Sequence, residues 1–203
     1  MKEILLKEYN NLKIEQLARI KIRDTLIYIS LSIFGGIFSF SMFGSEDKSI
    51  VLLVLPTVSF VLAWTYVVND EKISQIGEYI RCRLAPKIKE LEEGNPKGIF
   101  GWESYHRSDS GRFLRKLTQT AVDVVAFALP SIASLWLYNY KYSDHVTTQN
   151  NLVLGLVIWS FVISVLTTYI LIFYDYKEKF KNDGKIMQAL FGVAVACIVA
   201  VIF

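Results

Sequence analysis

The chain has 203 residues, of which 53% are hydrophobic, 22 are Lys or Arg and 19 are Asp or Glu. Its mean hydropathy of +0.36 exceeds what a soluble core of this length needs, and the excess is gathered in blocks. No phosphate-binding loop, nucleophile elbow or zinc-spaced cysteine pair occurs in the sequence. We therefore expect a membrane protein that is not an enzyme and that holds no metal or cofactor.

Five apolar blocks follow one another along the chain, at 25–44, 50–68, 117–138, 152–174 and 186–203. About 20 apolar residues in a helix cross a hydrocarbon layer of about 30 Å, so the first four blocks predict membrane spans. The fifth reaches the usual minimum length for a span and predicts either a fifth crossing or a re-entrant helix. The first block is too long for a signal peptide, and we expect it to be retained.

Basic residues are divided very unevenly among the segments between these blocks. Segments 1–24, 69–116 and 175–185 together hold 20 of the 22 Lys and Arg, and the two remaining loops hold only Lys48 and Lys141. Because positive loops stay in the cytoplasm, the N-terminus is predicted to be cytoplasmic and the protein to be a multi-pass inner-membrane protein. The histidines, His106 and His145, then lie on opposite sides and cannot share a metal ion.

The predicted fold class is all-α, a polytopic membrane helix bundle of four spans plus a fifth C-terminal helix, with a small helical cytoplasmic layer. Its expected segments are a cytoplasmic amphipathic helix (1–24), a first transmembrane hairpin (25–68), a basic cytoplasmic helical segment (69–116), a second transmembrane hairpin (117–174), and a cytoplasmic loop with a C-terminal apolar helix (175–203). Cys82 and Cys197 are not expected to form a disulfide, because Cys82 falls in a reducing compartment.

Residues 1–24 carry an apolar stripe at helical spacing, formed by Leu5, Tyr9, Leu12, Gln16 and Ile20 and widened by Leu6, Ile14 and Leu17. No Pro or Gly separates this stripe from the first span, so one long helix is predicted. The stripe is expected to pack on the rest of the cytoplasmic region or lie at the lipid surface. The alternative is an oligomerisation helix.

Segment 69–116 opens with a polar junction at 69–72 and then shows helical spacing through Ile73, Ile76, Ile80 and Leu84. Pro86 is predicted to interrupt this helix, and the turn at 94–96 to end its continuation. About 48 residues are too few for an independent core, so we expect the segment to pack on the N-terminal helix and on neighbouring subunits.

Asp123, Pro56 and Pro130 are the candidate pore or gating residues within the spans. An acidic side chain inside a span costs free energy and is usually functional. Asp123, however, lies only about two helical turns from Lys116, near the predicted cytoplasmic end of its span. Its alternatives are anchoring at the membrane surface and a pore-lining or inter-helix role. Proline frees a backbone carbonyl and can kink a helix, so Pro56 and Pro130 fit either helix packing or gating.

The candidate ligand-binding residues are basic or aromatic and lie in the cytoplasmic segment: Arg81, Arg83, Trp102, Glu103, Tyr105, Arg107, Arg112, Arg115 and Lys116. The basic positions suit either anionic lipid or, repeated around an oligomer axis, a polyanion such as a nucleotide or oligonucleotide. Trp and Tyr flanked by charge suit stacking on a ligand base, or else the core of the small cytoplasmic layer.

Three short motifs carry a resemblance to known proteins. They are Asn-Asp-Glu-Lys-Ile at 69–73, Gly-Glu-Tyr-Ile at 77–80 and Gly-Trp-Glu-Ser-Tyr at 101–105. The chain resembles small multi-pass bacterial membrane proteins with a Gly-Trp-Glu motif. In plan it is similar to the transmembrane effectors of nucleotide-signalling anti-phage systems, such as the Hailong membrane effectors. The resemblance implies a homo-oligomeric channel controlled by the nucleotide product of a partner nucleotidyltransferase, whose opening depolarises the cell.

Two other functions compete with a ligand-controlled channel. A non-channel scaffold would recruit a soluble protein to the membrane and would form no pore. A small transporter is disfavoured, because the spans show no inverted repeat and hold a single acidic residue. Membrane lipid is a partner in every case.

Overall fold

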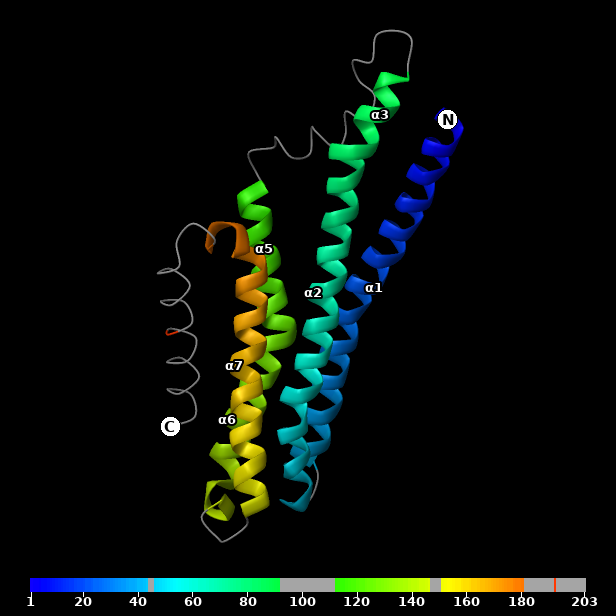
Figure 1. Cartoon of the computed structure of the whole chain (residues 1–203). Helices are drawn as coiled ribbons and strands as arrows, with labels where there is room; N and C mark the ends of the chain where they lie inside the picture. Colours follow the sequence, from blue (N-terminus) through cyan, green and yellow to red (C-terminus); the bar gives the residue numbers. More distant parts are fainter. Residues whose placement is uncertain (44–45, 92–111, 147–150, 181–191, 193–203) are drawn as a thin grey trace. The chain divides into compact units, whose positions relative to one another are not determined.

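A computed structural model describes residues 1–43, 46–91, 112–146, 151–180 and 192, and every regular element in these ranges is helical. The α-helices are α1 (Lys2–Phe43), α2 (Leu55–Tyr79), α3 (Ala85–Glu90), α5 (Arg112–Asp123), α6 (Leu129–Val146) and α7 (Asn151–Phe180) (Figure 1). A 3-10 segment, η1 (Glu46–Val54), precedes α2. Two π-helical segments, η2 (Ile80–Leu84) and η3 (Val124–Ala128), precede α3 and α6.

The prediction of four membrane spans is confirmed. The described residues include four helical runs that are long and apolar enough to cross a membrane: Lys2–Phe43, Ile50–Glu90, Leu114–Tyr140 and Asn151–Tyr174. The single long helix expected at the N-terminus is also confirmed, since α1 continues for 42 residues. The C-terminal apolar block, apart from Gly192, lies outside the described residues.

The helix after the second span is more continuous than predicted. The polar stretch 69–72 is an internal part of α2, and no turn interrupts the chain at Pro86. Instead the helix widens to the π form over Ile80–Leu84 and returns to the α form with Pro86 in its first turn. Proline lacks an amide hydrogen and its ring clashes with the carbonyl four residues earlier, so a wider turn just before it relieves the conflict.

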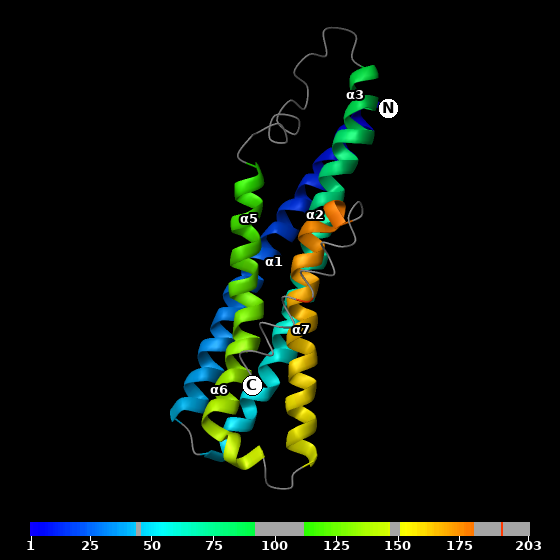
Figure 2. The same ribbon diagram turned by 90° about the vertical axis from the view of Figure 1, so that its left-hand side faces the viewer.

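The chain divides into two compact units. The hairpin unit comprises Met1–Thr25 with Tyr66–Leu117, and the bundle unit comprises Leu26–Thr65 with Thr118–Phe203. In the hairpin unit, the N-terminal part of α1 lies alongside η2 and α3 (Figure 1 and Figure 2). In the bundle unit, α6 and α7 lie side by side.

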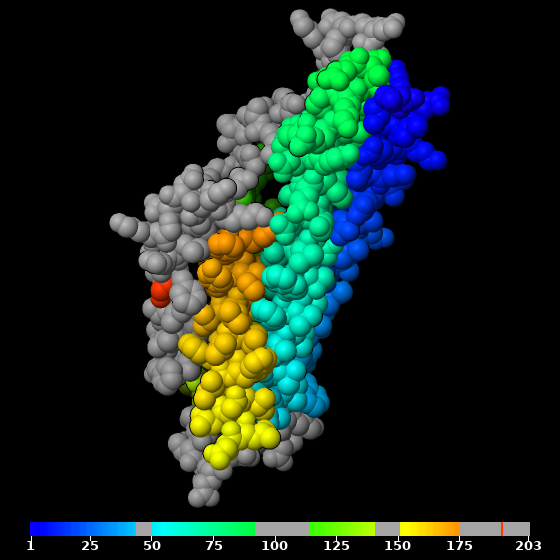
Figure 3. Space-filling model, in the orientation of Figure 1, coloured from blue at the N-terminus to red at the C-terminus, as the bar shows by residue number. Residues whose placement is uncertain are grey.

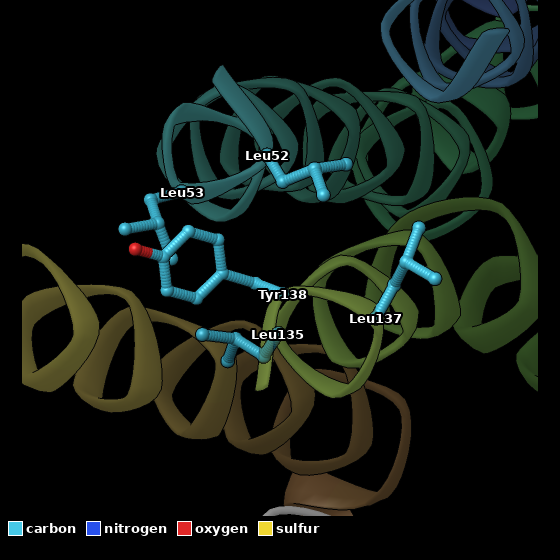
Figure 4. Close-up of a cluster of buried hydrophobic side chains, with 5 residues drawn as sticks. All are labelled: Leu52, Leu53, Leu135, Leu137 and Tyr138. Carbon is cyan, nitrogen blue, oxygen red and sulfur yellow. The ribbon is translucent and has the colours of Figure 1, made fainter. Parts of the chain in front are cut away.

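The bundle unit has a core of five buried side chains from η1 and α6, namely Leu52, Leu53, Leu135, Leu137 and Tyr138. Figure 4 shows the Tyr138 ring lying between Leu53 and Leu135. Partly buried residues of α1 and α7 complete the cluster: Ile37, Phe38, Val153, Leu156 and Val157. Four elements from distant parts of the sequence therefore meet at this core.

Candidate functional site

An apolar seam joins the two helices of the hairpin unit. Ile80, Leu84 and Ile88 are at most 2% exposed, and they pack with Leu5, Tyr9, Leu12 and Ile76. The space-filling view shows this part of α1 in continuous contact with the α2–α3 run (Figure 3). The predicted packing of the N-terminal stripe on the following polar segment is confirmed for Leu5, Tyr9 and Leu12.

The residues predicted to widen that stripe lie outside the seam. Ile14 is 67% exposed, Leu17 is 66% exposed and Leu6 is 38% exposed. Ile4, at the start of the same helix, is 71% exposed. These apolar side chains of α1 are therefore available to a partner, and their role in oligomerisation stays a prediction.

Polar contacts continue the seam along α1 and α2. Arg23 Nη1 donates to Asp70 Oδ1 at 2.8 Å, and Arg19 Nη1 donates to Asn69 Oδ1 at 3.5 Å. The Gln16 side-chain amide donates to the Ile73 carbonyl at 3.2 Å. Stretch 69–72, predicted as a junction, thus supplies part of the face of α2 that binds α1.

Arg23 makes an ion pair with Asp70 across this seam. Burial lowers the pKa of Arg23, but hydrogen bonds to Asp70 and to Asp24 outweigh that effect and raise it above its ordinary value. The guanidinium therefore stays charged throughout the accessible pH range. Sequence analysis did not single out Arg19 or Arg23. Arg19 and Arg23 are four residues apart, which places both on one face of the helix. This spacing could have identified them as contacts of the packed face.

A further polar contact joins α1 to the last residue of α2. Tyr79 donates its hydroxyl proton to Glu8 Oε1 at 2.7 Å. This hydrogen bond is the largest cause of a raised pKa at Tyr79, and Arg83 partly opposes it through its charge. Tyr79 and Arg83 thus flank the seam on its solvent side.

Four basic side chains of this unit lie on η2 and α3. Arg81 is half-buried and Arg83 is exposed on η2, and α3 adds exposed Lys87 and Lys89. Because Ile80 and Leu84 hold one side of this run in the seam, the basic side chains project from a fixed helix.

Helix α5 carries three more basic candidates, Arg112, Arg115 and Lys116. Arg115 and Lys116 are exposed, and Arg112 is described only as the first residue of that helix. The remaining candidates, Trp102, Glu103, Tyr105 and Arg107, lie outside the described residues.

In the bundle unit, both candidate prolines are buried at the second position of an α-helix. Pro130 has no amide hydrogen for the carbonyl of Ala126, four residues earlier. Ser30 Oγ donates to this carbonyl from α1 at 2.7 Å. A serine from another helix therefore replaces the donor that Pro130 lacks.

Pro56 shows the same arrangement. In a 3-10 helix the carbonyl of Leu53 would accept from residue 56, and proline cannot donate. Ser160 Oγ of α7 donates to the Leu53 carbonyl at 2.7 Å. Because a backbone group in lipid must be satisfied by the protein itself, these contacts favour the packing interpretation of both prolines.

Asp123 is the last residue of α5 and is 3% exposed. Its carboxylate is therefore enclosed within the bundle unit, beside the start of η3, rather than spread on the outer surface. This burial favours an inter-helix role over anchoring at the membrane surface. Among the described residues, no three His, Cys, Asp or Glu side chains gather into a metal site.

The architecture defines the class of the molecule. It is a multi-pass α-helical membrane protein with a polar helical hairpin. No protein-family model, no curated protein and no solved structure matches the chain.

Proposed function

We propose that this chain is an oligomeric, non-catalytic membrane effector of anti-phage defence. In this proposal the hairpin unit faces the cytoplasm and binds a nucleotide or oligonucleotide made by a partner nucleotidyltransferase. The bound ligand controls a pore through the inner membrane. Orientation rests on the concentration of Lys and Arg in the segments between spans.

The observation that carries the proposal is the basic run on η2 and α3. Arg81, Arg83, Lys87 and Lys89 project from a helix whose other side is locked into the seam by Ile80 and Leu84. Arginine binds phosphate through paired hydrogen bonds, and a clustered positive surface attracts polyanions. A rigid backbone under these side chains reduces the entropy lost on binding.

Two helices offer a route from this surface to the membrane spans. Helix α1 contributes its first part to the hairpin unit and its second part to the bundle unit, and α2 also contributes to both units. A ligand that shifts α2 against α1 in the hairpin unit would act on helices that continue into spans. Such a change requires different affinities of the ligand for the two states.

The test combines binding with conductance. The full chain is reconstituted in liposomes, and dye or ion release is measured with a panel of cyclic and linear di- and trinucleotides. Charge reversal in R81E/R83E and in R112E/R115E should abolish nucleotide binding and leave membrane insertion intact. The control K2E/K21E reverses two exposed charges of α1 and should bind normally. Unchanged binding in R81E/R83E rejects the basic surface as the ligand site.

A non-channel scaffold is the second candidate, favoured by the exposed apolar side chains of α1. Ile4, Ile14 and Leu17 are each more than 60% exposed, a pattern typical of a helix that binds a groove in another protein. This function predicts a soluble protein that co-purifies with the chain and is lost in I14K/L17K. Absence of conductance with every nucleotide, together with such a partner, would favour the scaffold.

A further inference from the structure

An exposed tyrosine ring adjoins the basic run of the hairpin unit. Tyr79 is 41% exposed, and its hydroxyl donates to Glu8 Oε1 of α1 at 2.7 Å. The next residue, Ile80, is fully buried in the seam, so the backbone that carries the ring is fixed. The ring is therefore held at its backbone and at its hydroxyl, while part of its surface stays open to a ligand.

Arg83 lies close to this ring. It follows Tyr79 by four residues, about one turn along the helix, and its charge partly opposes the raised pKa of the Tyr79 hydroxyl. An aromatic ring stacks on a nucleobase, and a guanidinium group binds phosphate through paired hydrogen bonds. The two side chains therefore offer one group for each half of a nucleotide.

A pocket of about 350 Å³ adjoins Tyr79 on the surface of α1. Its volume lies at the lower end of the range typical of small-molecule sites, about 300–1,000 Å³. The residues that line it include the acceptor of the Tyr79 hydrogen bond: Ile4, Lys7, Glu8, Asn11, Leu12 and Glu15. The hydroxyl of Tyr79 is therefore at the edge of the pocket.

The uncharged side chains of this pocket suit a flat heterocycle. Ile4 and Leu12 offer apolar contact to the face of a base. Asn11 carries both a hydrogen-bond donor and an acceptor on one amide, the combination that reads the edge of a base. These three side chains can therefore bind a base without any charged partner.

The charged side chains set the orientation of the ligand. Glu8 and Glu15 line the pocket and repel phosphate, whereas a carboxylate accepts hydrogen bonds from the amino groups of bases. Arg83 attracts phosphate from beside Tyr79. A nucleotide is therefore expected to place its base toward α1 and its phosphate toward η2.

We propose that Tyr79 is a stacking platform for one base of the nucleotide, with the edge of that base in the α1 pocket and the adjoining phosphate on Arg83. This inference rests on the proposed nucleotide surface of η2 and α3, and it adds the part of the site that recognises a base. The basic side chains attract any polyanion, whereas the platform requires an aromatic ring in the ligand.

The test compares dinucleotides that differ only in having bases. Binding of pApA, pGpG, pCpC, pUpU and an abasic dinucleotide with the same phosphates is measured on the full chain in detergent by isothermal titration calorimetry. The wild type should bind at least one base-bearing dinucleotide about tenfold more tightly than the abasic one. Y79A should remove this preference and leave abasic binding unchanged, whereas Y79F keeps the ring and should retain most of the preference.

Two further variants complete the test. N11L removes the amide from the pocket and should reduce the preference for bases about threefold, with abasic binding unchanged. Y28A is the matched control, because Tyr28 is a 71% exposed tyrosine of α1 in the bundle unit, and it should bind as the wild type does. Circular dichroism checks the helical content of each variant.

Equal affinity of the wild type for base-bearing and abasic dinucleotides would overturn this inference alone and leave the basic phosphate surface supported. So would an unchanged preference for bases in Y79A, or a loss of abasic binding in a folded Y79A. If the wild type binds none of these compounds, the inference fails together with the proposed nucleotide surface. If Y79A does not fold, N11L decides, and an unchanged preference in N11L overturns the inference.

Discussion

The hydrogen bond from Ser30 to the Ala126 carbonyl offers a direct test of how the bundle tolerates Pro130. In S30A, the donor at 2.7 Å disappears while the carbonyl remains buried. Leaving a buried polar group unsatisfied costs about 1–3 kcal/mol in general, and inter-helix hydrogen bonds in membrane proteins reach about 1.7 kcal/mol. We expect S30A to lower the free energy of unfolding by about 1–1.5 kcal/mol.

Repeating S30A in a P130A background tests whether Ser30 replaces the donor that Pro130 lacks. P130A returns an amide hydrogen to position 130, so the Ala126 carbonyl regains a backbone donor. S30A should therefore lose less than about 0.5 kcal/mol in the P130A background, and the difference is the coupling between the two residues. Unfolding in mixed micelles with increasing SDS, followed by circular dichroism, measures all four proteins of the cycle.

Ser32 provides the matched control, because it lies on the same helix and is exposed. S32A should change the free energy of unfolding by no more than about 0.5 kcal/mol. An equal loss from S30A in the wild-type and P130A backgrounds would refute the idea that Ser30 replaces the missing proline donor. It would instead mean that Ser30 stabilises the bundle through packing alone.

Two further predictions concern the seam of the hairpin unit. L84A should lower the free energy of unfolding by about 2–5 kcal/mol, because Leu84 is only 1% exposed in the seam. The control L91A, at a leucine that is 39% exposed, should lower it by less than about 1 kcal/mol. Similar losses for the two variants in SDS titrations would contradict the packing of the seam. The pKa of Tyr79 is raised, so its hydrogen bond to Glu8 stabilises the fold fully at pH values below the ordinary tyrosine pKa near 10. This stabilisation is lost as the pH rises through the raised pKa of Tyr79 in the folded protein. The ultraviolet titration curve of Y79F, subtracted from that of the wild type, should therefore show Tyr79 ionising at a raised pH. E8Q should remove this shift. An unshifted ionisation of Tyr79 in the wild type would contradict its contact with Glu8.

The spans and the long first helix were predictable because they depend on the residues of one contiguous stretch of sequence. Apolar length decides whether a helix crosses the membrane, and the absence of Pro and Gly before the first span favours one continuous helix. The seam residues Leu5, Tyr9 and Leu12 were found by helical periodicity for the same reason. Periodicity did not distinguish them from Ile14 and Leu17, which turned out to be exposed.

Pro86 shows where local rules mislead. Proline ordinarily ends or kinks a helix, and this rule predicted an interruption. The structure keeps the helix by widening it over Ile80–Leu84, with the Ala85 amide bonded to the Ile80 carbonyl five residues earlier. The seam contacts of Ile80, Leu84 and Ile88 hold both sides of that turn, so tertiary packing overrides the local preference.

Hydrophobic length and charge are properties of neighbouring residues, and they are enough to define a four-span helical membrane protein with basic segments between its spans. The groups that replace the proline donors become visible only once the helices are packed. Ser30 lies 96 residues from Ala126, and Ser160 lies 107 residues from Leu53. No local pattern relates residues so far apart, and their pairing arises because a buried carbonyl in lipid requires a donor from within the protein.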